Sequence, residues 1–345
     1  MMRAGWGLCI AAILALSACD VVRVPGDGRA APAPVPNGAP GPVPPSTPIS
    51  DPYGDGEVTP TPVTDPDTET PTPLDTDEPS PPATDTTPPV VDPTPPEPEP
   101  LPIKFQYYAA GSLTPGSGTG SPDATVYAPD IIFPIKDAPT FPQSQVWRPG
   151  GGMSTGGQCD PLNYSAPWQD NFCETRSKTR NTPHCPTNKV HQGQDIRVGT
   201  AEGCRQMVAM RPEKPSLYEL VAVEDGIVQY IGGYYIALKG TTSGNIYNYI
   251  HLNMSALQVG LGETVTAGQT LGYVSNDFGG TATTFHLHFE IKAPIEGEGI
   301  THVPPYMSLV AAYERREGGR GEMIEDNTIS IASIPVIPDG FEIIE

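Results

Sequence analysis

A stretch of 83 residues, from Asp20 to Pro102, limits the part of this chain that can fold. It holds 26 of the 44 prolines, and its 15 acidic residues against two arginines give it a net charge of −13, out of −21 for all 345 residues. Few of its side chains are apolar or aromatic, so their burial would not offset the entropy lost on folding. We predict a disordered, extended linker here and a folded head that begins at Ile103.

The first 18 residues have the pattern of a secretory signal. Arg3 precedes an apolar run of 15 residues, 4–18, which is shorter than the roughly 20 residues of a membrane-spanning helix. The run leads into Leu-Ser-Ala-Cys at 16–19, which resembles the lipobox of bacterial lipoproteins. By this resemblance Cys19 is lipidated after cleavage and anchors the protein to a membrane. An ordinary signal peptide with an incidental cysteine is the alternative.

The charge balance excludes two classes of protein. From Ile103 to the end, 16 Lys and Arg face 25 Asp and Glu, a net charge of −9, whereas nucleic-acid binding requires a basic surface. No second long apolar run follows the signal, which excludes a membrane protein with several spans.

Apart from Cys9 in the signal and Cys19, four cysteines remain: Cys159, Cys173, Cys185 and Cys204. An even set in an exported domain indicates two disulfides. We predict the pairs Cys159–Cys173 and Cys185–Cys204, because both loops are short. A structural zinc site formed by these cysteines with His184 is the alternative.

The head has the pattern of a mainly β, antiparallel domain. Short apolar runs punctuated by Gly and Asn predict strands at Leu220–Val223, Gly226–Ile231, Tyr234–Lys239, Asn245–Leu252, Thr264–Val265, Gln269–Val274 and Thr284–Ile291. Helical periodicity is best at Met307–Arg315. Ile131–Ile135 and Ser144–Trp147 read as two further short strands, and the apolar run Ile329–Ile337 as an edge strand or a mobile segment.

One predicted strand carries most of the candidate chemistry. In the segment from Phe285 to Ile291, a period of two places apolar side chains on one face and His286, His288 and Glu290 on the other. Two histidines on a rigid strand are a typical arrangement of metal ligands, and two surface histidines are the alternative. We predict that Glu290 bonds to His288 or is a plain surface carboxylate.

Two upstream segments add to this set. His191 and Asp195 lie four residues apart, and His251 follows Tyr247 and Tyr249 at strand spacing, which predicts that all three share a face. Together with the strand at 285–291, these two segments hold four of the six histidines.

Two other histidines and one arginine carry weaker predictions. We expect His184 and His302 in loops, without a catalytic role. Arg197 is expected to meet a substrate carboxylate or to pair with Glu202.

In order along the chain, HxxxD from His191, YxHL from Tyr249 and HLHFE from His286 resemble the lysostaphin/LytM-type zinc metallopeptidases. Residues 221–228 and 263–272 resemble two further segments of that family, and the resemblance extends from about residue 184 to 313. It implies a LytM-like β-sheet domain with one Zn²⁺ per chain. An apparent insertion at 200–220 departs from the family pattern.

The resemblance also assigns roles within the site. It implies zinc ligation by His191, Asp195 and His288, with His251 and His286 as the unligated catalytic histidines. Three protein ligands leave one zinc position for the water that attacks the peptide bond. Which of the two histidines acts as the base stays open.

By the same resemblance, the expected function is a peptidoglycan endopeptidase that hydrolyses cross-link peptides, either D-Ala–diaminopimelate links or polyglycine bridges. An exported lipoprotein with a disulfide-bonded head is typical of Gram-negative bacteria, which favours the former. The alternative is a non-enzymatic LytM-like regulator that activates cell-wall amidases. A metal-storing or metal-sensing lipoprotein is a third reading, for which the chain has few surface His or Met. We expect the protein at the periplasmic face of a bacterial membrane, inner or outer, with peptidoglycan as its partner and a regulatory protein partner left open.

These expectations divide the chain into five parts. They are a signal peptide (1–18), a lipidated Cys19 with a disordered tether (19–102), an N-terminal extension of the head (103–183), the LytM-like domain (184–315) and an acidic tail (316–345).

Overall fold

A computed structural model describes residues 99–210, 217–325 and 339–344 of the chain. The signal segment, Cys19, almost all of the predicted tether and the run 329–337 therefore lie outside the described residues. Among the described residues, no helix combines the length and the apolarity needed to cross a membrane. All of them belong to one compact unit, Val90–Glu345.

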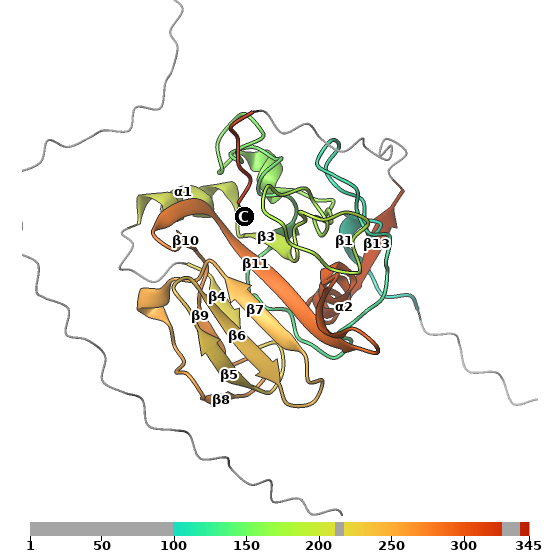
Figure 1. The fold of residues 1–345 in the computed structure, drawn as a ribbon, viewed down its shortest axis with the longest axis vertical. Coiled ribbons are helices and arrows are strands. Elements are labelled where there is room, and N and C mark those ends of the chain that lie inside the picture. The colour runs from blue at the N-terminus through green and yellow to red at the C-terminus, as the bar shows by residue number, and fades with distance from the viewer. Residues whose placement is uncertain (1–98, 211–216, 326–338, 345) are drawn as a thin grey trace, which may run out of the picture. The chain divides into compact units, whose positions relative to one another are not determined.

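The main sheet of the described residues has nine strands, of which seven follow the order β2-β3-β11-β7-β6-β5-β8, while β10 and β12 both pair with β11 (Figure 1). The pairs within this sheet are antiparallel. Its strands are β2 (Thr140–Pro142), β3 (Gln194–Val198), β5 (Gly226–Ile231), β6 (Tyr235–Gly240), β7 (Ile246–Ile250), β8 (Thr264–Val265), β10 (Ser275–Phe278), β11 (Thr281–Ile295) and β12 (Gly299–Val303). The predicted mainly β, antiparallel fold is confirmed.

The remaining elements surround this sheet. Two small sheets pair β1 (Ile103–Tyr108) with β13 (Arg320–Ile324) in parallel and β4 (Glu219–Val221) with β9 (Thr270–Tyr273) antiparallel. The helices are α1 (Ala201–Ala209) and α2 (Tyr306–Glu317), with 3-10 turns η1 (Pro161–Tyr164) and η2 (Met254–Ala256). All seven strands predicted from residue 220 onward overlap an observed strand, and the predicted helix lies within α2.

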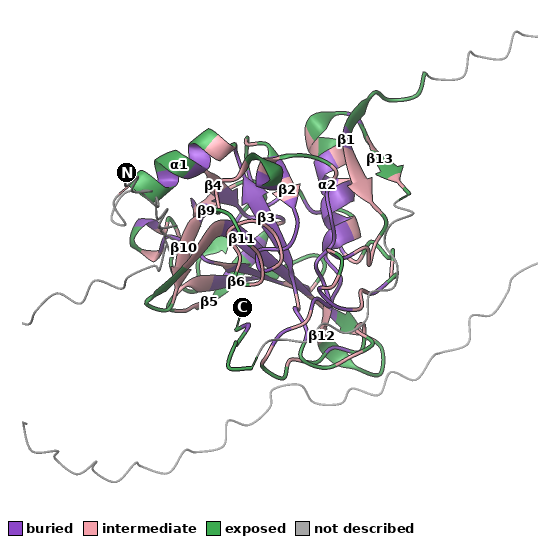
Figure 2. Ribbon diagram, turned by 90° about the horizontal axis from the view of Figure 1, so that it is seen from above, coloured by how far each residue is buried: buried purple, intermediate pink, exposed green. Residues whose placement is uncertain are grey.

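The long strand β11 is the centre of the fold, and both of its faces are covered in its middle part, as the purple ribbon in Figure 2 shows. Leu287, Phe289 and Ile291 are buried in the main apolar core. The opposite face carries His286, His288 and Glu290, which are also buried. The alternation predicted for this segment is therefore confirmed, with the polar face inside a site instead of on the surface.

The region before residue 184 shares this core. The ring of Trp168 lies 4.6 Å from that of Phe105 on β1 and 4.5 Å from that of Tyr313 on α2. Its indole Nε1–H donates to the backbone carbonyl of Thr140 on β2 (2.8 Å). Aromatic packing of this kind binds the extension, the C-terminal helix and the sheet edge together.

The strand predicted at Ile131–Ile135 was wrong. Pro134 has no N–H to donate to a ladder, and the carbonyls of Ile131 and Ile135 accept from the guanidinium groups of Arg315 and Arg316 on α2 (2.6 and 2.8 Å). The segment is thus an extended strap held by α2 and by backbone hydrogen bonds with residues 219–223, and Ile135 forms an isolated bridge to β4.

The strand predicted at Ser144–Trp147 was also wrong, because a serine side chain competes for its backbone. The Ser144 hydroxyl accepts from the N–H groups of Val146 and Trp147 (3.2 and 2.9 Å), which bends the chain into a turn. Helix α1 was not predicted; it lies within the apparent insertion, and the hydroxyl of Thr200 caps its start by accepting from the N–H of Gly203 (3.0 Å).

The predicted disulfide pairing was wrong as well, although all four cysteines are paired. The bonds are Cys159–Cys204 and Cys173–Cys185, 45 and 12 residues apart in sequence. Cys173–Cys185 closes a shorter loop than either predicted pair, and the long Cys159–Cys204 loop costs little more because the entropy of loop closure grows only slowly with length. Helix α1 carries Cys204 to the η1 region, where α1 and η1 are in contact. The alternative zinc site of these cysteines with His184 is thereby excluded.

Candidate metal centre

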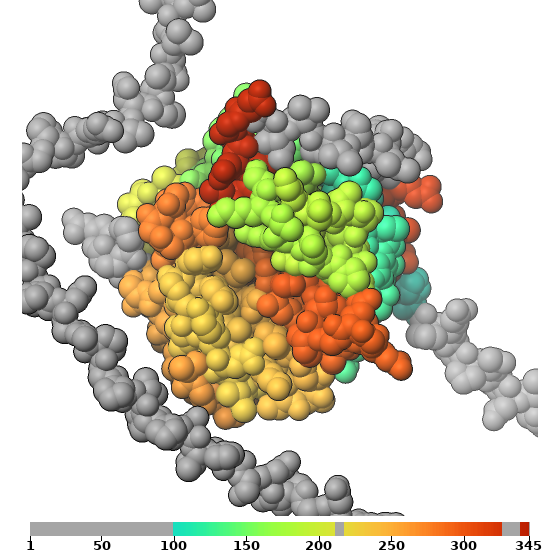
Figure 3. Space-filling view, viewed as in Figure 1, coloured from blue at the N-terminus to red at the C-terminus, as the bar shows by residue number. Residues whose placement is uncertain are grey.

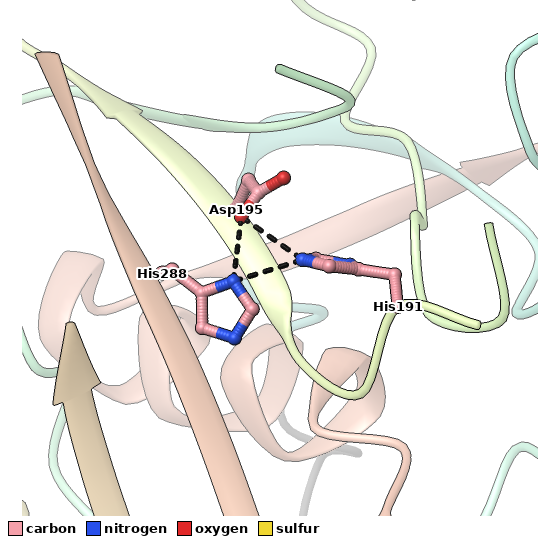
Figure 4. Close-up of side chains that lie close together, drawn as sticks. All are labelled: His191, Asp195 and His288. Atoms are coloured by element: carbon pink, nitrogen blue, oxygen red, sulfur yellow. Dashed lines mark hydrogen bonds and ion pairs between the residues drawn. The ribbon is translucent and has the colours of Figure 1, made fainter. Parts of the chain in front are cut away.

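The sheet register places two of the predicted ligands opposite each other. His288 on β11 pairs with Asp195 on β3, and His191 lies just before β3. His288 Nδ1 is 3.0 Å from Asp195 Oδ1, His191 Nε2 is 3.2 Å from the same oxygen, and the two nitrogens are 2.8 Å apart (Figure 4). Within the described residues, these three form the one group whose ligand atoms converge as a metal site requires.

Hydrogen bonds on the far side of each ring decide which nitrogen faces the centre. His191 Nδ1 lies 2.9 Å from the backbone carbonyl of Asn171, and His288 Nε2 lies 3.1 Å from Glu290 Oε1. Since each partner only accepts, these nitrogens carry the N–H, and a neutral ring then has its lone pair on the other nitrogen. Two lone pairs and a carboxylate oxygen of Asp195 therefore converge on one point, a donor set that fits Zn²⁺.

Gly193 makes this convergence possible. A Cβ at this position would lie 2.6 Å from His288 Nε2 and 2.7 Å from the carbonyl oxygen of Phe289. The turn between His191 and β3 can therefore pack this closely against β11 only because residue 193 has no side chain.

Asn171, which the sequence analysis missed, holds two ligands at once. Besides accepting from His191, it donates from Nδ2 to Asp195 Oδ2 (2.6 Å) and accepts at Oδ1 from the Asp195 N–H (3.0 Å). Behind it, the guanidinium of Arg176 lies 3.9 Å from Asp195 Oδ2 and 3.0 Å from a carboxylate oxygen of Glu174. All of these side chains are buried. No motif or periodicity marks them in the sequence, because their role depends on a tertiary contact.

Glu290 bonds to His288, as one of the two predictions for it stated. Its other oxygen accepts from the amide of Asn248 (2.6 Å) and lies 3.2 Å from His302 Nε2. His302 was predicted to lie in a loop, but it lies on β12. There it contacts the carboxylate of Glu290, which in turn orients the candidate ligand His288.

The two predicted catalytic histidines lie beside the three ligands. His286 Nε2 is 3.5 Å from Asp195 Oδ1, and the ring centroids of His251 and His286 are 4.6 Å apart. Nδ1 of His286 lies 2.8 Å from the carbonyl of Thr284, and Nδ1 of His251 lies 2.8 Å from the carbonyl of Asp277. In both neutral rings the lone pair is therefore on Nε2.

His251 reaches the site by a backbone turn that strand alternation does not predict. Tyr247 and Tyr249 face the core, where both are fully buried. Strand β7 ends at Ile250, and His251 takes φ = +67°. This left-handed conformation, uncommon for residues other than glycine, turns its side chain to the face of His288. The prediction that His251 and the tyrosines share a face was wrong.

The charges around the centre favour a cation. Burial alone would raise the pKa of Asp195, but the imidazoles of His191, His286 and His288 outweigh it and hold the pKa well below its usual range. Burial lowers the pKa of His191 to about 4, so this ring is neutral and able to bind metal near neutral pH.

The remaining predicted residues lie elsewhere. Arg197 is buried on β3, where it donates to the carbonyl of Gln158 (3.1 Å), and Glu202 pairs with Arg205 instead (2.9 Å). His184 packs against Tyr127 and Asp123, with Nδ1 3.3 Å from the carboxylate.

A cleft of about 240 Å³ opens beside the centre, and both His251 and His288 line it. Its walls come from the strands β6, β7 and β11 on one side and from the loop at 180–192 on the other. In the space-filling view, the lime-green part of the chain and the yellow strands flank a hollow in which orange atoms are visible (Figure 3).

Residues 207–301 match peptidase family M23. This segment contains His251, His286 and His288. It begins after His191 and Asp195, which the pairing of β3 with β11 brings to the same site. The resemblance to lysostaphin/LytM-type peptidases is thus confirmed for this segment. No curated protein matches the chain.

Several solved structures are similar to this one. A putative glycyl-glycine endopeptidase lytM from Ruminococcus gnavus is 20% identical, with 58% of this chain and 66% of that chain covered and a TM-score of 0.32. The catalytic domain of the antimicrobial peptidase lysostaphin from Staphylococcus simulans is 18% identical (40% and 92% covered, TM-score 0.25), and a zinc-containing peptidase from Vibrio cholerae is 20% identical (39% and 35% covered, TM-score 0.24). The chain spans just under two thirds of the first of these.

Proposed function

We propose that this protein is a zinc-dependent endopeptidase that hydrolyses the cross-link peptides of peptidoglycan. The observation that carries the proposal is the convergence of three acceptor atoms, from His191, Asp195 and His288, beside a cleft that His288 lines. The match of residues 207–301 to peptidase family M23 supports the same function.

His191, Asp195 and His288 would hold the zinc ion, with Asn171 and Glu290 fixing the ligands from behind. When bound there, zinc supplies a Lewis acid that polarises the scissile carbonyl and makes water more acidic. Three protein ligands are the number typical of catalytic zinc sites.

His251 and His286 would then move the protons. Each ring is held at Nδ1 by a backbone carbonyl, so that Nε2 can accept the proton of the attacking water or donate to the leaving amine. A positively charged ring beside the scissile bond also stabilises the oxyanion of the tetrahedral intermediate.

The intact residue set favours an enzyme over an amidase-activating regulator. A regulator needs neither metal ligands nor proton donors, whereas here all five side chains are present and gathered within one site. The disulfide-bonded head also supports an exported location, and we propose that lipidated Cys19 anchors it at the periplasmic face of a membrane.

Muropeptide release from purified sacculi tests the proposal. The full chain should convert cross-linked dimers into monomers, while a chelated sample and a His288→Ala variant should not. Release of sugar fragments alone, or equal release by the variant, would contradict it.

A further inference from the structure

We propose that the Cys173–Cys185 disulfide is a positioning element of the metal centre, which holds His191 and its partner Asn171 in the arrangement that metal binding requires. The inference rests on the proposed function, since it names what makes that metal site complete. It distinguishes this bond from a disulfide that only stabilises the fold.

The candidate ligand His191 is held by backbone hydrogen bonds to the segment 171–176. Its N–H donates to the carbonyl of Glu174 (2.8 Å), and its own carbonyl accepts from the N–H of Cys173 (3.0 Å). Bonds on both sides of one residue fix its backbone in two directions. The position of His191 is therefore set by the segment that carries Cys173.

The same segment also orients the side chains of two ligands. Asn171 lies two residues before Cys173, and its backbone carbonyl accepts from His191 Nδ1 (2.9 Å). Its side-chain amide donates to Asp195 Oδ2 (2.6 Å). A shift of this segment would thus displace His191 and Asp195 together.

This segment belongs to a small apolar cluster and not to the main core. Phe172, Cys173 and Val190 are buried in that cluster, and Cys185 packs against it. Cys173 takes φ = +68°, a conformation that is uncommon for residues other than glycine and persists only where the surroundings fix it. The bond to Cys185, 12 residues further along the chain, is a covalent constraint on this cluster.

Loss of this bond should have a local effect. Regions with few buried apolar contacts open at a lower free-energy cost than the core does. Without the disulfide, the segment 171–176 and His191 should therefore open together, while β7 and β11 stay closed.

The second disulfide provides a matched control. Cys159–Cys204 joins residues 45 apart in sequence, against 12 for Cys173–Cys185, and ties α1 to the η1 region. In the chain-entropy description, a cross-link across a longer loop stabilises the fold more. The control bond should therefore matter more for global stability and less for zinc affinity, which separates positioning from stability.

The test measures zinc affinity by competition with a chromogenic chelator. It compares the full chain with the double variants Cys173→Ala/Cys185→Ala and Cys159→Ala/Cys204→Ala, in which alanine is used because free thiols bind zinc themselves. We expect the first variant to lose about ten- to a hundredfold in affinity and the second to keep the wild-type value. Wild-type affinity in the first variant, or equal losses in both, would overturn the inference.

Amide hydrogen exchange of the metal-free proteins gives a second readout that needs neither zinc nor turnover. In Cys173→Ala/Cys185→Ala, the amides of His191 and of residues 171–176 should exchange faster than in the wild type, with β7 and β11 unchanged. Faster exchange throughout the chain would make the bond a general stabiliser and overturn the inference. If the wild type binds no zinc but the variant opens locally in this way, the proposed function fails and the positioning role stands.

Discussion

His191 Nε2 and His288 Nδ1 lie 2.8 Å apart, and in the neutral form of each ring the nitrogen at this contact carries the lone pair, because the other nitrogen bonds to an acceptor. The hydrogen bonds of Asp195 and Glu290 outweigh burial and raise the pKa of His288, so a cation, either a proton or a metal ion, is favoured between the two nitrogens and the Asp195 carboxylate. The arrangement is therefore the one expected of a metal site.

Replacing Gly193 with alanine should weaken the metal site. The new Cβ would meet His288 Nε2 at 2.6 Å and the Phe289 carbonyl at 2.7 Å, so the ligand must move. We expect zinc affinity to fall about ten- to a hundredfold, measured by competition with a chromogenic chelator. Gly157→Ala is the control, since its Cβ would meet no atom within 4 Å, and equal affinities of the two variants would refute the explanation.

Asn171→Ala removes two side-chain bonds to Asp195, while the backbone bond to His191 stays. We expect a similar loss of zinc affinity, about tenfold or more, with the fold retained by circular dichroism. The exposed Asn181 offers a control substitution to alanine. If Asn171→Ala binds zinc as the wild type does, Asn171 does not position the ligand.

His286→Ala and His251→Ala should separate catalysis from metal binding. Each variant should keep one zinc per chain but lose about 10²- to 10⁴-fold in kcat, because proton transfer contributes that much. His184→Ala, which alters a histidine outside the site, should leave both quantities unchanged. Loss of zinc from either catalytic variant would make that histidine a ligand instead.

Asp170 gives a stability prediction with a defined sign. Burial raises the pKa of its carboxyl from 3.8 to about 6, against the lowering effect of the N–H groups of Phe172 and Gly111. The folded state therefore favours the protonated form, and its stabilising effect, present below pH 3.8, is lost as the pH rises through about 6.

A shift of about two units corresponds to about 3 kcal/mol. Relative to Asp170→Asn, which cannot ionise, the free energy of unfolding of the wild type should fall by about this amount between pH 4 and pH 7, as measured by urea denaturation. A difference that stays constant with pH would show that the carboxyl titrates normally.

The sequence predicts the motif-bearing parts of this molecule well and the contacts between distant segments poorly. The alternation around His288 depends on the strand period alone, and it correctly predicts both faces of β11. In contrast, the φ of +67° at His251 depends on the backbone bond from its N–H to Tyr234, which no local pattern encodes.

The supporting residues were missed for the same reason. Asn171 lies 20 residues before His191 in sequence and meets it only because the chain returns alongside the β3 region. The disulfide pairs and the strap at residues 131–135 likewise depend on where α1 and α2 pack. Local sequence therefore predicts which side chains gather at the candidate site, whereas tertiary packing decides what holds them.

A zinc titration of the chelated full chain tests the central claim most directly. Zinc is added in steps. At each step, both the rate of cleavage of cross-linked dimers and the amount of protein-bound zinc are measured. Activity should rise in proportion to bound zinc and reach its plateau at one equivalent, while His288→Ala gains neither. Full cleavage by the zinc-free protein, or one tightly bound zinc without any cleavage, would contradict the account.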